Sequence, residues 1–182
     1  MWTRLLIIIT GLTVASTVAA DTTDRKDLEV FKDISTAVTR YAHFTIFDSV
    51  DANVKDGIVT LSGKVTMPYK RDEIAKRVAG IDGVREVQDR IDVLPASRFD
   101  DELRYRIARA IYGNPSFWNY AIMASPPIHI VVEHGRVTLT GVVQSETDRM
   151  LARSLATQFG VMSVANDLKT DGEVQRALEK TF

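Results

Sequence analysis

The apolar residues in the first part of the chain recur with two different periods. Between residues 28 and 41 the apolar positions lie three and four apart, which is the spacing of one face of an amphipathic helix. In residues 50–54 and 59–65 they lie two apart, as in strands with one buried face. The pair Asp56-Gly57 stands between these two runs, and Asp-Gly is a strong hairpin signal because both central residues of a type I′ turn need a positive φ. The pattern therefore predicts a helix followed by a β-hairpin.

A second helical pattern follows the hairpin. Thr66 can cap its first turn, and Pro68 is tolerated there because the first helical N–H groups have no partner within the helix. This helix is predicted to bury Ile74 and to end near Gly80. Alternation resumes over residues 84–93, which predicts a third strand. The predicted order is helix, strand, strand, helix, strand.

The whole pattern occurs twice. Residues 54–65 return as residues 132–143, 78 positions later, with seven of twelve residues identical. Residues 74–91 match residues 151–168 at an offset of 77. A repeated turn signal with its flanking apolar pattern indicates two copies of one small unit. We expect an α+β fold of two tandem α-β-β-α-β units, each a three-stranded mixed sheet packed by two helices on one face.

The second copy supplies the same elements. Asp100 or Asp101 can cap its first helix, and its hairpin turns at His134-Gly135. Residues 161–168 are predicted to form its last strand. Its second helix is predicted to bury three apolar side chains, those of Leu151, Leu155 and Phe159.

The two ends of the chain lie outside the repeat. Residues 1–20 show a positive start, a mostly apolar run and the small residues Val18-Ala19-Ala20, which is the order of a secretory signal peptide cut after Ala20. An uncleaved anchor is the alternative, although the apolar run is shorter than the roughly 20 residues that cross a bilayer. The predicted organisation is a signal peptide at residues 1–20, domains at residues 25–95 and 99–170, and a helical tail at residues 171–182.

Composition argues against several classes of function. The chain has 23 basic and 24 acidic residues and a formal net charge of −1, whereas nucleic-acid binding normally needs a strongly basic face. It contains no Cys, so it has neither a disulfide nor a lipidated Cys. Its three His residues lack the spacing of metal ligands, and no motif frames a nucleophilic Ser. We therefore expect a non-enzymatic protein with no catalytic residue, no metal, no cofactor and no nucleic-acid partner.

The two copies differ most between the first helix and the hairpin. The stretch from Ile34 to Val54 takes 20 residues in the first copy, and the matching stretch from Ile107 to Val132 takes 25 in the second. The longer segment concentrates four aromatic residues, which are Tyr112, Phe117, Trp118 and Tyr120. Two arginines precede them three residues apart on the predicted helix, Arg106 and Arg109.

These six residues form a candidate lipid-binding site. Rings with a polar tip favour the headgroup level of a membrane, and guanidinium groups bind lipid phosphates. The alternative is that the rings complete the core of the second unit or fill the space between the copies, since a small domain needs aromatic side chains for its core.

Both copies resemble the BON domain family. The motif x-V-x-D/H-G-x-V-T-L-x-G-x-V, followed by a helix and by G-V-x-x-V-x-N/D-x-L/I, covers residues 54–65 with 83–91 and residues 132–143 with 160–168. The resemblance implies a periplasmic protein that binds anionic phospholipid or a membrane surface and supports the cell envelope under osmotic stress. An alternative function is a protein-interaction or scaffolding module of an envelope assembly, with an envelope protein as partner.

Overall fold

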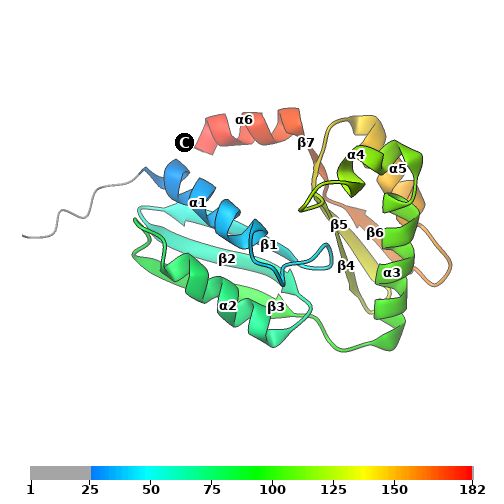
Figure 1. Ribbon diagram of the computed structural model, residues 1–182, viewed down its shortest axis with the longest axis horizontal. Helices are drawn as coiled ribbons and strands as arrows, with labels where there is room; N and C mark the ends of the chain where they lie inside the picture. Colours follow the sequence, from blue (N-terminus) through cyan, green and yellow to red (C-terminus); the bar gives the residue numbers. More distant parts are fainter. Residues whose placement is uncertain (1–25, 182) are drawn as a thin grey trace, which may run out of the picture.

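The computed structural model describes residues 26–181 and shows two units that follow one another in the chain (Figure 1). The predicted signal peptide, residues 1–20, lies outside the described residues. None of the helices within residues 26–181 is both long enough and apolar enough to cross a bilayer.

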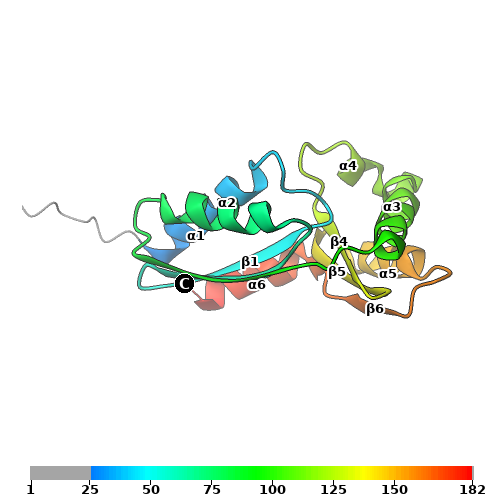
Figure 2. The same ribbon diagram turned by 90° about the horizontal axis from the view of Figure 1, so that it is seen from below.

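Unit one has the predicted order of helices and strands. It consists of α1 (Asp27–Thr39), β1 (Ser49–Lys55), β2 (Ile58–Val65), α2 (Pro68–Ala79) and β3 (Glu86–Val93). The sheet order is β1-β2-β3, with β1 antiparallel and β3 parallel to β2, so the sheet is mixed as predicted. Helices α1 and α2 cover one face of this sheet (Figure 2) and bury their apolar side chains against it.

Unit two repeats this plan with additional elements. It consists of α3 (Arg98–Tyr112), the 3-10 turn η1 (Pro115–Phe117), α4 (Trp118–Ala121), β4 (Ile128–Glu133), β5 (Arg136–Val143), α5 (Glu146–Ala156), β6 (Ser163–Asn166), β7 (Lys169–Thr170) and α6 (Asp171–Thr181). Strands β4, β5 and β6 form the expected mixed sheet, and the short β7 also pairs parallel with β5. The fold class is confirmed, with a fourth strand that the sequence pattern did not predict.

The last helix, α6, leaves unit two and runs beside unit one. Figures 1 and 2 both show its end near the start of α1, and Figure 2 places it on the opposite side of the sheet from α1 and α2. Because β7 pairs with β5 immediately before α6, the direction of this helix is set by the sheet of unit two.

Both hairpins close with the predicted type I′ turn. Asp56 and Gly57 have φ values of 51° and 74°, and His134 and Gly135 have values of 51° and 72°. Strand pairing continues directly up to these residues, with Lys55 opposite Ile58 in the first hairpin. The two-residue turn therefore fixes the register of each hairpin.

In each unit, a carboxylate at the start of the first helix accepts hydrogen bonds from the backbone N–H groups of the hairpin turn. We call this arrangement the turn clamp. Asp27 accepts hydrogen bonds from the backbone N–H groups of Asp56 and Gly57 at 2.8 and 3.1 Å. Asp100 accepts the equivalent bonds from His134 and Gly135 at 2.9 and 2.8 Å. The clamp ties the start of each helix to the end of its hairpin.

The clamp corrects the predicted role of Asp100. The residue that caps α3 is Ser97, whose hydroxyl oxygen accepts a hydrogen bond from the backbone N–H of Asp100 at 3.2 Å. Asp100 lies within the first turn of the helix and is buried, with its carboxylate directed at the hairpin. Asp101, the other predicted cap, pairs instead with Arg104.

A second buried carboxylate, Asp48, organises the segment between α1 and β1. It accepts hydrogen bonds from the backbone N–H and hydroxyl groups of Thr45 and of Thr66, at 2.7 to 2.8 Å, and from the Lys70 ammonium at 2.6 Å. Burial alone would raise the pKa of Asp48, but the ammonium and the N–H and O–H donors outweigh burial and hold that pKa below its ordinary value. Thr66 is used here, so its predicted role as the cap of α2 is wrong.

The two units pack against each other along β1 and β4, which are the edge strands of their sheets. The backbone N–H of Ile130 donates to the carbonyl oxygen of Ile46 at 2.7 Å, and the hydroxyl groups of Ser49 and Thr140 are 2.8 Å apart. Further contacts are an ion pair between Lys64 and Glu133, ring contacts between Phe44 and His129 and between Phe47 and Tyr105, and packing of Phe47 on the core of unit two.

His129 sits at this junction in an environment that disfavours its charged form. Its ring centroid lies 5.3 Å from that of Phe44, and within the described chain its buried Nδ1 has no hydrogen-bond partner. Burial lowers the pKa of His129 below its ordinary value, and the nearby carbonyl groups of Asp48 and Thr45 act in the opposite direction without offsetting burial.

We predict that acidification weakens the junction through His129. Because the pKa of His129 is lower in the folded chain, its stabilising contribution is complete above the ordinary value of 6.5 and is lost as the pH falls from there toward the folded pKa. Urea unfolding between pH 7 and pH 5.5 should show this loss in the wild type and a flatter dependence in His129→Gln. An unchanged pH dependence in the variant would contradict the assignment.

We also predict that loss of the clamp in unit two is costly. Asp100→Ala leaves two backbone N–H groups without their charged acceptor, so the free energy of unfolding should fall by about 3 kcal/mol, given about 1.5–3 kcal/mol for a hydrogen bond to a charged group. Asp27→Ala removes the more exposed clamp and should cost less. Urea unfolding followed by circular dichroism measures both, and equal losses would show that burial is not the deciding factor.

Candidate functional site

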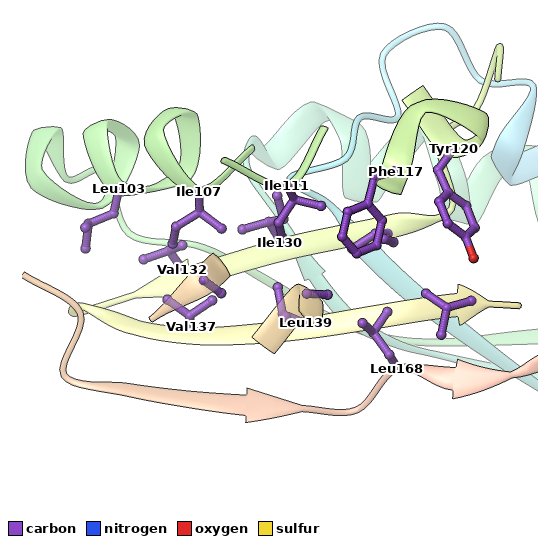
Figure 3. Packing of buried hydrophobic residues seen from close by; sticks show 14 residues of the cluster. Leu103, Ile107, Ile111, Phe117, Tyr120, Ile130, Val132, Val137, Leu139 and Leu168 are labelled. Carbon is purple, nitrogen blue, oxygen red and sulfur yellow. The ribbon is translucent and has the colours of Figure 1, made fainter. Parts of the chain in front are cut away.

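The aromatic insert of unit two contributes mainly to the core. Figure 3 shows Phe117 and Tyr120 pointing from η1 and α4 toward the space between α3 and the sheet. Phe117 is 0% exposed, and its ring lies 5.7 Å from that of Tyr120. Both rings were candidate lipid-contacting residues, and their burial removes them from the surface.

The hydroxyl groups of the two tyrosines form hydrogen bonds that connect the insert to the rest of unit two. Tyr120 donates to the carboxylate of Asp148 at 2.8 Å and accepts from the backbone N–H of Gln144 at 2.7 Å. Tyr112 donates to the carbonyl oxygen of Ile128 at 2.6 Å and accepts from the N–H of the same residue at 3.1 Å. Burial raises the pKa of both hydroxyl groups, so they remain neutral donors. Tyr112 is half-buried and is also not a free surface ring.

Trp118 is the one aromatic residue of the insert that faces solvent, with 65% of its surface exposed. Ile122 and Met123, which follow it, are exposed as well. These three side chains form a small apolar patch, which we call the insert patch. Of the predicted site residues this patch contains Trp118, and it lies on α4 and the two residues that follow this helix.

The two predicted arginines remain on the surface. Arg106 and Arg109 are exposed on α3. Arg106 donates to the carbonyl oxygen of Phe159 at 3.2 Å, so it lies beside the loop that follows α5 and not beside the aromatic insert. The structure therefore separates Arg106 from the rings with which the sequence grouped it.

The loop between α5 and β6 shows a second apolar surface, which we call the apolar tip. It consists of Phe159, Met162 and Phe99, which are 92%, 75% and 51% exposed. A Cβ added at Gly160 would meet the Phe99 ring at 3.2 Å, and one added at Gly135 would meet Met162 at 3.1 Å. Phe99 and Met162 thus flank the hairpin turn that Asp100 clamps.

The apolar tip corrects the prediction that Phe159 is buried. Helix α5 ends at Ala156, and the positive φ of Gly160, 89°, turns the chain after Phe159. The side chain therefore leaves the helical stripe that packs on the sheet, where Ala152 and Ala156 are buried.

Comparison of the two copies shows that the tip is specific to unit two. Matching Ile34 to Ile107 places Lys26 on Phe99, and the offset of 77 places Asp82 on Phe159 and Arg85 on Met162. All three residues of unit one are charged and exposed. Unit two therefore presents apolar side chains at three surface positions where unit one presents charged ones. Alignment of the copies could have shown this from the sequence, but only if Phe159 had not been assigned to the core.

Three arginines surround the apolar tip. Arg98 precedes Phe99, Arg136 follows the clamped turn at Gly135, and Arg106 bonds to the Phe159 carbonyl. Within residues 26–181, Arg98 and Arg136 form no ion pair, while Glu102 lies on the same exposed stripe of α3 as Arg106. The tip thus combines exposed apolar side chains with a mainly cationic rim.

A metal site is not formed by the described part of the chain. Across residues 26–181, no group of three or more His, Cys, Asp and Glu side chains is arranged to hold a metal ion.

The fold and the surfaces define a class of protein, a tandem pair of small α+β modules whose second copy carries exposed apolar surfaces. The BON domain profile matches residues 32–95 and 100–172, which together span most of the chain. The chain belongs to the BON domain family, as the sequence motifs indicated.

The chain is also similar to individual proteins, among them a curated relative and two solved chains. Osmotically-inducible protein Y of Escherichia coli (strain K12) is 35% identical over 127 residues, which are 67% of this chain and 63% of that protein. The chain thus spans less than two thirds of the length of this relative.

Two solved chains of CdsD, described as a structural protein of the type III secretion system of Chlamydia trachomatis, are 13% and 14% identical. They cover 85% and 79% of this chain, and 99% and 66% of their own lengths, with TM-scores of 0.30 and 0.33. Scores this low do not establish a shared arrangement of the whole chain.

Substitution of the two neighbouring residues Phe117 and Trp118 should change the free energy of unfolding by very different amounts. Phe117→Ala removes a fully buried ring and should lower the free energy of unfolding by about 3–5 kcal/mol. Trp118→Ala removes an exposed ring and should change it by less than about 0.5 kcal/mol. Urea unfolding followed by circular dichroism tests the pair, and a large loss in Trp118→Ala would contradict the surface assignment.

Proposed function

We propose that this BON-family protein is a non-enzymatic module that binds anionic phospholipid surfaces through the apolar tip of unit two. We further propose that it is exported to the periplasm after removal of residues 1–20 and that it supports the cell envelope under osmotic stress. The observation that carries the proposal is the replacement of Lys26, Asp82 and Arg85 by Phe99, Phe159 and Met162 at equivalent exposed positions.

The chemistry of the tip suits a membrane interface. Large apolar side chains that remain exposed on a folded domain mark interaction surfaces, because their hydration is unfavourable. Phe159 and Met162 stand on a loop, where they can enter the boundary between headgroups and acyl chains without unfolding the domain. The guanidinium groups of Arg98, Arg106 and Arg136 would then lie at the level of the lipid phosphates and form charge-assisted hydrogen bonds with them.

The predicted site residues take different parts in this proposal. Arg106 belongs to the rim of the tip, and Arg109 lies one turn further along the exposed face of α3. Trp118 offers a second apolar contact in the insert patch. Tyr112, Phe117 and Tyr120 act indirectly, since they hold the insert in place.

The comparisons support the biological setting. The relative in Escherichia coli is named for its osmotic induction, and it is 35% identical to this chain over 127 residues. We extend a response to osmotic conditions from that protein to this chain as part of the proposal.

Vesicle co-sedimentation tests the proposed function. Wild-type protein should bind vesicles containing phosphatidylglycerol or cardiolipin and should bind phosphatidylcholine vesicles weakly. The double variant Phe159→Ser, Met162→Ser should lower the binding constant at least tenfold, and Arg106→Ala should lower it less and weaken its salt dependence. Because Phe159 and Met162 make few contacts with the core, the double variant should remain folded.

Two further variants locate the contact. Met67→Ser changes an apolar side chain of unit one that is 50% exposed and should bind as the wild type does. Trp118→Ala tests the insert patch, and a loss confined to this variant would move the contact away from the tip. Absence of wild-type binding to any anionic vesicle would refute the proposal and favour the protein-interaction alternative, in which the tip binds an envelope protein.

A further inference from the structure

A cavity of about 610 Å³ lies between the two units, away from the apolar tip. Its walls come from α1 and the edge strand β1 on one side and from β4, β5 and β7 on the other. A smaller cavity of about 390 Å³ adjoins it and shares Thr39, Phe44, Ser125 and His129 as lining residues. The larger cavity falls within the range of about 300–1,000 Å³ that small-molecule sites occupy.

The lining of the larger cavity is largely apolar. Six half-buried apolar residues contribute to it, namely Phe31, Phe44, Val50, Ala52, Pro127 and Val142. They come from both units, so the complete lining exists only where the units pack together. Half-buried rings and aliphatic side chains around an open cavity favour an apolar occupant over water.

The charges at the two cavities are mainly positive. Lys169 of β7 lines the larger cavity and Arg40 lines the smaller one. In the part of the chain from residue 26 to residue 181, neither cation forms an ion pair, and Asp51 is the one acidic residue that lines either cavity. Lys169 and Asp51 carry opposite charges within the larger cavity, and Arg40 of the adjoining cavity makes the net charge of the two cavities together positive. This net charge favours a ligand with an anionic end.

We propose that this cavity between the units binds one fatty acid anion. Its aliphatic chain lies between α1 and β1 of unit one and the β4–β5 wall of unit two, and its carboxylate lies at Lys169. A cavity of this volume accommodates one such chain and not the two chains of a phospholipid.

The site is separate from the membrane contact proposed above. The cavity is formed by residues of both units, whereas the apolar tip belongs to the α5–β6 loop and the start of α3. Binding of a soluble fatty acid therefore does not require membrane binding, and either proposal can fail without the other.

Isothermal titration calorimetry with laurate, below the concentration at which it forms micelles, tests the site. The wild type should bind one laurate per chain. Ala52→Trp fills the cavity from unit one and Val142→Trp fills it from unit two, and each should weaken binding at least tenfold. Asn53→Trp places the same ring on the same strand at an exposed position outside the cavity and should bind as the wild type does.

The anionic end is tested with a matched probe and a matched pair of variants. Dodecyltrimethylammonium has the same chain length and the opposite charge, and it should bind at least tenfold more weakly than laurate. Lys169→Met should weaken laurate binding about tenfold, whereas Lys55→Met, an exposed lysine that does not line the cavity, should not. If a tryptophan variant fails to fold, the comparison of Lys169→Met with Lys55→Met still tests whether laurate binds in the cavity.

Several results would overturn the proposal. These are the absence of one-to-one laurate binding, unchanged affinity in both cavity-filling variants when they are folded, equal affinity for the cationic probe, and equal effects of Lys169→Met and Lys55→Met. The variant Phe159→Ser, Met162→Ser should retain laurate binding, which separates this outcome from failure of the membrane proposal.

Discussion

The structure depends most on the hydrogen bonds between one helix carboxylate and the hairpin turn in each unit. A type I′ turn leaves backbone N–H groups at the end of the sheet, and Asp27 and Asp100 each accept two of them. The first helix of each unit is thereby fixed across its sheet at one point, which sets how its apolar stripe meets the strands. In unit two the same bond brings the start of α3, and with it Phe99, against the turn next to which Met162 lies. The turn clamp thus positions the apolar tip in unit two. The same clamp exists in unit one, where charged side chains occupy the positions equivalent to the tip.

The framework could be predicted from the sequence because its signals are local. The hairpins follow from two-residue turns between alternating runs, and the helices follow from spacings of three and four, so the order α-β-β-α-β appears correctly in both units. The hydrogen-bond partners of Asp100 and Thr66 could not be predicted in this way. Their partners lie 34 or 35 and 18 residues away in the chain, and both residues occupy positions that also suit a helix cap.

The candidate site was predicted only in part, for a related reason. The aromatic insert was found from the difference in length between the copies, but adjacent rings in an irregular segment have no period from which burial can be inferred. Phe117 is therefore in the core while Trp118, the next residue, faces solvent. Phe159 continues the helical spacing of Leu151 and Leu155, and its exposure follows only from the end of α5 at Ala156.

The path of α6 determines which points of the molecule are suitable for attachment to a surface or to a linker. The helix returns along unit one, so the start of α1 and the end of α6 lie at the same end of the molecule, while the α5–β6 loop lies at the other end (Figures 1 and 2). A protein tethered by either of these two points would direct Phe159 and Met162 away from its attachment. Immobilisation on a sensor surface, or a linker to another protein, would for this reason leave the tip accessible.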